Sequence, residues 1–255
     1  MNKILTFLAM TIALTATAAT ADKEVRVYEI RTYTASAGKM EALHKRFRDH
    51  TVRLFQKHGI EQLGYFVPVD APETKLVFVL SYPSRAARDQ SWKAFMADPE
   101  WVTAFKESEK NGSLVSKVEN PFYLATDYSP AIKASAGTEA RAFELRTYTA
   151  RAGNLAGLNA RFRDHTVALF AKHGMTNLAY WNLMPDQKGA GDMLVYIIAH
   201  KSREAAAESF KNFRTDAAWT KARAESEKKA GGSLTAAKDG VISLFLKATD
   251  YSPTK

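Results

Sequence analysis

The sequence predicts an α+β protein of two tandem ferredoxin-like units, each with the element order βαββαβ, whose sheets pack face to face as one closed or nearly closed barrel with pseudo-two-fold symmetry. Three observations predict this fold. The 255-residue chain repeats itself once, each repeat alternates strand and helix patterns, and each repeat leaves one apolar sheet face uncovered. We assign residues 22–130 to unit 1, residues 131–140 to a linker and residues 141–255 to unit 2.

The internal repeat is close to identical over several stretches, which indicates two homologous units. The repeated pairs are Glu29–Thr34 with Glu144–Thr149, Arg46–Thr51 with Arg161–Thr166, and the string Ala-Thr-Asp-Tyr-Ser-Pro at residues 125–130 with 248–253. The segment that joins the two copies is small and polar, as is typical of a linker. His200 stands where unit 1 has Tyr82, a titratable difference which indicates that the two units have diverged.

Residues 1–21 have the pattern of a signal peptide. Lys3 precedes a short apolar stretch, and a small-residue region ends in Ala19-Thr20-Ala21. We expect cleavage between Ala21 and Asp22 and therefore an exported protein, periplasmic or secreted. The alternative is an uncleaved N-terminal anchor. Beyond this segment, no apolar run reaches the roughly 20 residues that a stable membrane span needs.

The periodicity of apolar residues places the elements of unit 1 in order. Alternation over Val25–Thr34 predicts the first strand, and apolar steps of three and four from Met40 to Leu54 predict a helix that ends before Gly59. The remaining predicted elements are strands at Gln62–Val67, Leu76–Tyr82 and Leu114–Leu124, a helix from Ser84 to Met96, and a short helix from Asp98 through Phe105. Unit 2 repeats this order.

Both helices of each unit would cover one face of its sheet, so the other face needs a cover. We place Val27, Glu29, Arg31 and Tyr33 on that second face by strand alternation. About half a dozen large apolar side chains at ~1.5–3 kcal/mol each amount to roughly 10 kcal/mol, which equals the stability of a typical domain. The matching face of the second unit is the nearest available cover, and this predicts the barrel.

Several strings in unit 1 resemble the NIPSNAP family. They are Val27–Thr34 followed by Gly38-Lys39, Lys57-His58-Gly59 with Gly64-Tyr65-Phe66, and Asp98-Pro99-Glu100-Trp101. Unit 2 resembles the family's opening strand well, but its late segment Asp216-Ala217-Ala218-Trp219 lacks the Pro-Glu pair. The resemblance covers nearly the whole mature chain in two copies. It implies the dimeric α/β-barrel group, whose members include cofactor-free monooxygenases, haem-binding and haem-degrading proteins, and small-molecule isomerases.

His50 and His165 are the predicted catalytic residues. Each stands on the apolar stripe of the first helix of its unit, where a leucine would be expected. A buried imidazole needs partners for both ring nitrogens. Three interpretations stay open: a core histidine satisfied by a carbonyl or a carboxylate, a general base or haem ligand that faces the inter-sheet cavity, or a residue at the edge of the surface.

The predicted substrate-binding residues form one row in each unit. They are Glu29, Arg31 and Tyr33 in unit 1, and Glu144, Arg146 and Tyr148 in unit 2. Charges on an inter-sheet face are costly unless they are paired. One interpretation is a structural Glu–Arg pair. The other is an anion clamp, in which the arginine holds a carboxylate or propionate through two hydrogen bonds and the tyrosine lines the same wall.

Composition narrows the classes of function. The chain carries a formal net charge of +9, but its basic residues alternate with acidic ones along the predicted helices, so we expect no nucleic-acid partner. It contains no cysteine, which excludes disulfides and thiolate metal sites, and we expect no metal. No phosphate loop, nucleotide fingerprint or nucleophile elbow is present.

The leading functional hypothesis is an exported barrel protein that binds a small molecule in the inter-sheet cavity. It would need no cofactor and could also be an enzyme of the oxygenase or proton-transfer type. Two alternatives are kept: a haem-binding or haem-handling protein, and a non-catalytic interaction module. The tandem chain could further form a homodimer.

Overall fold

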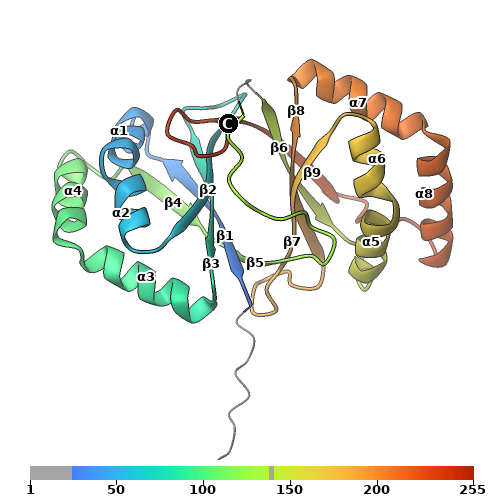
Figure 1. Cartoon of the computed structure of the whole chain (residues 1–255), viewed down its shortest axis with the longest axis horizontal. Coiled ribbons are helices and arrows are strands. Elements are labelled where there is room, and N and C mark those ends of the chain that lie inside the picture. The colour runs from blue at the N-terminus through green and yellow to red at the C-terminus, as the bar shows by residue number, and fades with distance from the viewer. Residues whose placement is uncertain (1–24, 138–140) are drawn as a thin grey trace, which may run out of the picture.

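The computed structural model describes residues 25–137 and 141–255, so the predicted signal peptide and the last part of the predicted linker lie outside the described residues. Within them the chain forms one closed antiparallel barrel with helices on its outside (Figure 1). The predicted fold class is confirmed.

The two units follow the same element order, except that the last strand of unit 1 is divided in two (Figure 1). Unit 1 contains β1 (Val27–Ala35), α1 (Met40–Arg46), the π-helix η1 (Phe47–Thr51), α2 (Val52–Lys57), β2 (Glu61–Pro68), β3 (Lys75–Tyr82), α3 (Arg85–Ala97), α4 (Pro99–Glu109), β4 (Val115–Glu119) and β5 (Phe122–Ala125). Unit 2 contains β6 (Ala142–Thr149), α5 (Leu155–Arg161), the π-helix η2 (Phe162–Thr166), α6 (Val167–Lys172), β7 (Thr176–Leu183), β8 (Met193–His200), α7 (Arg203–Thr215), α8 (Ala217–Lys229) and β9 (Val241–Ala248).

Eight strands close the barrel in the order β1-β3-β2-β9-β6-β8-β7-β5, with β5 returning to β1. The two seams between the units are β2 with β9, where Phe66 pairs with Ala248, and β5 with β7, where Tyr123 pairs with Leu183. The strand predicted over Leu114–Leu124 is divided into β4 and β5 around Pro121, which has no amide hydrogen for a sheet hydrogen bond. The last strand of each unit therefore joins it to the other.

Apolar side chains from both units fill the barrel interior. Its buried members include Tyr28, Ile30, Phe66, Val77, Val79, Tyr123, Phe143, Trp181, Val195, Ile197 and Leu246. A pocket that reaches this interior beside residues 132–135 has a volume of about 40 Å³, far below the ~300–1,000 Å³ of sites for drug-sized ligands. The prediction that each unit covers the apolar face of the other is confirmed, whereas the prediction of a ligand cavity between the sheets is wrong.

The assignment of strand faces in β1 is also wrong. Tyr28 and Ile30 point into the barrel, and Glu29, Arg31 and Tyr33 lie on the opposite face, beneath the helices of unit 1. The same holds for Glu144, Arg146 and Tyr148 in unit 2. Both faces of this strand are covered, so alternation separates two sets of residues without showing which set faces which layer.

The repeated Ala-Thr-Asp-Tyr-Ser-Pro strings form reciprocal clasps, in which each string docks on the other unit. In the clasp of unit 2, the Tyr251 hydroxyl lies 2.8 Å from His44 Nδ1, and Ser252 Oγ accepts a 2.9 Å hydrogen bond from the amide of Tyr65 in β2. In the clasp of unit 1, the Tyr128 hydroxyl donates to Asn159 at 2.8 Å, and Ser129 Oγ accepts from the amide of Tyr180 in β7 at 3.0 Å. These contacts reinforce the two seams.

A π-helical turn interrupts the first helix of each unit and changes which residues face the sheet. After Phe47 the next buried residue is Thr51, whose hydroxyl donates to the carbonyl oxygen of Arg46 at 3.2 Å, and His50 turns outward. The same turn in unit 2 leaves His165 exposed. A π-turn adds a residue to the helical repeat and so shifts the stripe by one position. The placement of both histidines on the buried stripe is therefore wrong.

Among the described residues, no helix combines the length and the hydropathy that crossing a bilayer would require.

Candidate functional site

A row of buried polar side chains lies between the sheet and the helices of each unit. In unit 1, Glu29 is fully buried and receives hydrogen bonds from Arg31 at 2.5 Å and from Arg88 of α3 at 3.0 Å. Arg31 also donates to the Tyr33 hydroxyl at 3.1 Å, and its guanidinium lies over the ring of Trp92 at 4.3 Å. Ion pairing satisfies the buried carboxylate, so the predicted Glu29–Arg31 pair is present on the helix-covered face.

Unit 2 has the same row of buried polar side chains, but its glutamate has different hydrogen-bond partners. Glu144 accepts hydrogen bonds from Arg146 at 2.5 Å and from Ser243, and its other oxygen lies 3.0 Å from His200 Nε2. Ala206 stands where unit 1 has Arg88. Burial would raise the pKa of Glu144, but the hydrogen bond with His200, the charge of Arg146 and the bond from Ser243 outweigh it and lower that pKa. The carboxylate therefore stays ionised without a second arginine.

A cavity of about 220 Å³, partly open to solvent, lies beside this row in unit 2, between β6, the first helix and the helices α7 and α8. Arg146 and Tyr148 line it from the sheet, and Arg161 lines it from the end of α5. Five aromatic residues also line it, Phe162, Phe170, Phe210, Phe213 and Trp219, together with polar and charged side chains of α8 and the segment before β9. The volume suits a ligand with a single ring better than a drug-sized molecule.

Arg161 is the unusual group in this cavity. Its side chain is 6% exposed, and its Nε and Nη1 atoms have no hydrogen-bond partner among the described residues. The guanidinium lies over the ring of Trp219 at 5.2 Å, and burial lowers its pKa. Glu227 lies 3.7 Å from Nη1, beyond hydrogen-bond range, so these two buried N–H groups lack an acceptor that a bound ligand would supply.

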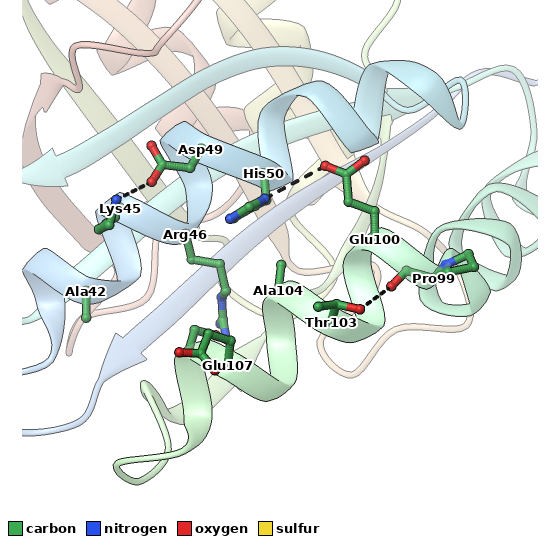
Figure 2. Close-up of a pocket in the computed structure, with 11 residues that line it drawn as sticks. Ala42, Lys45, Arg46, Asp49, His50, Pro99, Glu100, Thr103, Ala104 and Glu107 are labelled. Atoms are coloured by element: carbon green, nitrogen blue, oxygen red, sulfur yellow. Dashed lines mark hydrogen bonds and ion pairs between the residues drawn. The ribbon is translucent and has the colours of Figure 1, made fainter.

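The predicted catalytic histidines lie elsewhere. His50 lines a groove of about 650 Å³ on the outer surface of unit 1, between the first helix and α4 (Figure 2). Its Nδ1 lies 3.8 Å from Glu100, and a Lys45–Asp49 pair lies at the same groove. The side chains of Lys45, Asp49 and Glu100 are 38–74% exposed, so water already solvates their charges. His165 occupies the matching groove of unit 2, of about 340 Å³.

The structure thus brings Arg146 and Tyr148 together with Arg161 in one cavity, which neither histidine lines. His165 shares only the surface groove of unit 2 with Arg161. Sequence reasoning missed Arg161 as a site residue, although it begins the repeated Arg-Phe-Arg-Asp-His-Thr string. A comparison of the two copies could have indicated a site in unit 2. Arg223 stands there in place of Phe105, and Phe210 in place of Trp92.

Comparisons with known proteins show what this chain is similar to. The NIPSNAP family model matches residues 28–130 and again 143–253. A protein from Fusobacterium nucleatum named as a proposed monooxygenase has 11% identity and a TM-score of 0.59, with 88% of this chain and 92% of that chain covered. A NIPSNAP family protein from Agrobacterium tumefaciens has 24% identity and a TM-score of 0.38, with 42% of this chain and 98% of that chain covered.

An anthrone oxidase-like protein has 14% identity and a TM-score of 0.50, with 92% of this chain and 95% of that chain covered. No curated protein matches the sequence.

Proposed function

The chain belongs to the NIPSNAP family and carries two tandem copies of its domain, and on that premise we propose that it is a small-molecule-binding protein whose site is the cavity between the helices and the sheet of unit 2. The observation that carries this proposal is the buried Arg161, without a hydrogen bond at Nε or Nη1 among the described residues, in a cavity that several aromatic rings line. This site replaces the inter-sheet cavity, whose space is filled by side chains.

The difference between the two units supports this choice. At the position of Phe210, unit 1 has the larger Trp92, which packs on Arg31 and donates to the Tyr82 hydroxyl at 2.7 Å. An indole ring in place of a phenyl ring takes up space beside the polar row. We therefore assign ligand binding to unit 2 and a mainly structural role to unit 1.

A cofactor-free enzyme of the oxygenase or proton-transfer type is the second candidate. Arg146 donates to the Tyr148 hydroxyl oxygen at 3.2 Å, and both side chains line the cavity, where they would serve as hydrogen-bond donors to a bound substrate. Such donors stabilise negative charge that develops on a bound substrate. The names of the similar folds, a proposed monooxygenase and an anthrone oxidase-like protein, agree with that chemistry.

Haem is not part of the proposal. Neither His50 nor His165 lines the unit 2 cavity, and its volume of about 220 Å³ is small for such a large macrocycle. Purified protein should show no Soret band, either as isolated or after haem is added.

A fragment screen with a matched pair of variants tests the binding proposal. We expect small fluorinated aromatics to bind in fluorine NMR, and Phe210→Trp, which gives unit 2 the residue of unit 1, to weaken that binding about tenfold or more because the indole occupies ligand space. The control is Trp92→Phe, the reverse change in unit 1, which should leave binding unchanged. Equal effects of both changes, or no binding at all, would contradict the proposal.

We also propose that the protein is exported after cleavage between Ala21 and Asp22 and that it could form a homodimer. Intact mass and N-terminal sequencing of protein from its own cells test the cleavage. Light scattering after size exclusion tests the dimer.

A further inference from the structure

One pair of equivalent arginines differs between the two units in how its charge is satisfied. In unit 1, Arg46 extends from the end of α1 toward α4 (Figure 2). Its Nη1 donates to Glu109 at 2.6 Å and to Ser108 Oγ at 3.1 Å, and the rings of Trp101 and Phe105 lie within 5.5 Å of its guanidinium. The carboxylate of Glu109, which belongs to the same chain, therefore pairs with Arg46.

In unit 2 the equivalent carboxylate, that of Glu227, forms its hydrogen bond with a different arginine. Arg223, which replaces Phe105, donates from its Nε to Glu227 at 3.1 Å. The distance from Glu227 to Arg161 is consequently 3.7 Å, which is beyond hydrogen-bond range. The position that Glu109 fills in unit 1 lacks an equally close carboxylate among the described residues of unit 2.

The unit 2 cavity also carries an excess of positive charge. Arg146, Arg161, Arg214 and Arg223 line it, whereas Glu227 is the single acidic residue among the described lining residues. Glu144, which is not among the lining residues, forms an ion pair with Arg146 and neutralises its charge. Arg214 and Arg223 are exposed, and Arg161 is buried. Charge complementarity at this site therefore requires an anion that reaches Arg161.

The aromatic walls restrict the rest of the ligand. Phe162, Phe213 and Trp219 present ring surfaces to the cavity, and the Phe213 and Trp219 ring centroids are 4.4 Å apart. A free phosphate would satisfy Arg161 but would make no use of the ring surface that lines the cavity. An aromatic ring would cover them through edge and face contacts, which contribute beyond the burial of area.

We infer that the unit 2 cavity takes a small aromatic carboxylate, whose carboxylate pairs with Arg161 as Glu109 pairs with Arg46, while its ring packs among Phe162, Phe213 and Trp219. This inference rests on the proposed function and names the class of ligand for the same site. In unit 1 the chain's own Glu109 occupies the position that we assign to the carboxylate of the ligand in unit 2.

Isothermal titration calorimetry of the tandem protein at about pH 7 tests the ligand class, with benzoate and its neutral counterpart benzyl alcohol as probes. We expect one benzoate per chain, bound about 10- to 100-fold more tightly than benzyl alcohol, because hydrogen bonds to charged groups are the strong ones. Equal affinity for the two probes would overturn the inference and leave the proposed function standing. Binding of neither probe would contradict both.

A pair of variants on α8 tests the role of Arg161 without changing Arg161 itself. Arg223→Phe restores the residue of unit 1 and frees Glu227 to pair with Arg161, so benzoate affinity should fall about 10-fold or more while benzyl alcohol affinity changes little. Lys221→Phe is the control, because it removes the same charge and adds the same ring at a site that is 76% exposed. Unchanged benzoate affinity in folded Arg223→Phe, or an equal loss in Lys221→Phe, would overturn the assignment.

Discussion

Packing between the two units can be measured at one pair of rings inside the barrel. Phe66 of unit 1 and Phe143 of unit 2 are 2% and 0% exposed, and their ring centroids are 5.0 Å apart at an angle of 57°. Phe66→Leu and Phe143→Leu keep most of the buried volume but remove this ring contact. We expect each single change to lower the free energy of unfolding by about 1 kcal/mol, with a coupling between them of about 0.5–1.5 kcal/mol.

The assay is urea unfolding followed by tryptophan fluorescence and by far-UV circular dichroism. Both signals should show one coincident transition, because the units share a single interior. A control cycle pairs Phe66→Leu with Phe170→Leu, since Phe170 belongs to the separate core beneath the helices of unit 2. That pair should be additive within about 0.5 kcal/mol. Two separate transitions, or no coupling between Phe66 and Phe143, would refute the shared interior.

Three further sets of variants test other parts of the structure. Ser252→Ala removes the acceptor of the Tyr65 amide in the unit 2 clasp, so the free energy of unfolding in urea should fall by about 1–3 kcal/mol, and Ser129→Ala in the less buried unit 1 clasp should cost less. Hydrogen bonds from Lys172 and His173 lower the pKa of Asp216, so its stabilisation is complete above about pH 4 and is lost as the pH falls toward the lowered pKa. Asp216→Asn should therefore be less stable than the wild type in urea at neutral pH, and the difference should vanish in strong acid. His50→Leu and His165→Leu should each change the free energy of unfolding by less than about 0.5 kcal/mol and leave ligand affinity in the unit 2 cavity unchanged, because both histidines lie outside that cavity and the buried core. A larger loss of stability in these two variants would restore the core interpretation.

The sequence was sufficient for the architecture, because the duplication and the uncovered sheet face are both visible in the pattern of residues. It could not decide which face of β1 points inward. Tyr28 and Ile30 form one alternate set, and Val27 and Tyr33 belong to the other, so both sets carry apolar rings. Helices cover one set and the partner sheet covers the other, and alternation alone does not distinguish these two kinds of cover.

The site was less accessible to sequence reasoning, for two physical reasons. The π-turns at Phe47–Thr51 and Phe162–Thr166 have identical sequences, so comparison of the copies could not reveal a shift in helical phase. The free acceptor position at Arg161 arises because Glu227 lies 3.1 Å from Arg223 but 3.7 Å from Arg161. The sequence does not specify such distances. The exchange of Tyr82 for His200 did indicate divergence, and His200 proves to hold the buried Glu144.

The most direct test of the account is a crystal structure of the protein with 4-bromobenzoate, in which anomalous scattering locates the bromine. We expect one bromine per chain, between β6 and the helices α7 and α8, with the carboxylate within hydrogen-bond distance of Arg161. Bromine in the barrel interior, in the groove beside His50, or equally in both units would contradict the assignment of the site to unit 2.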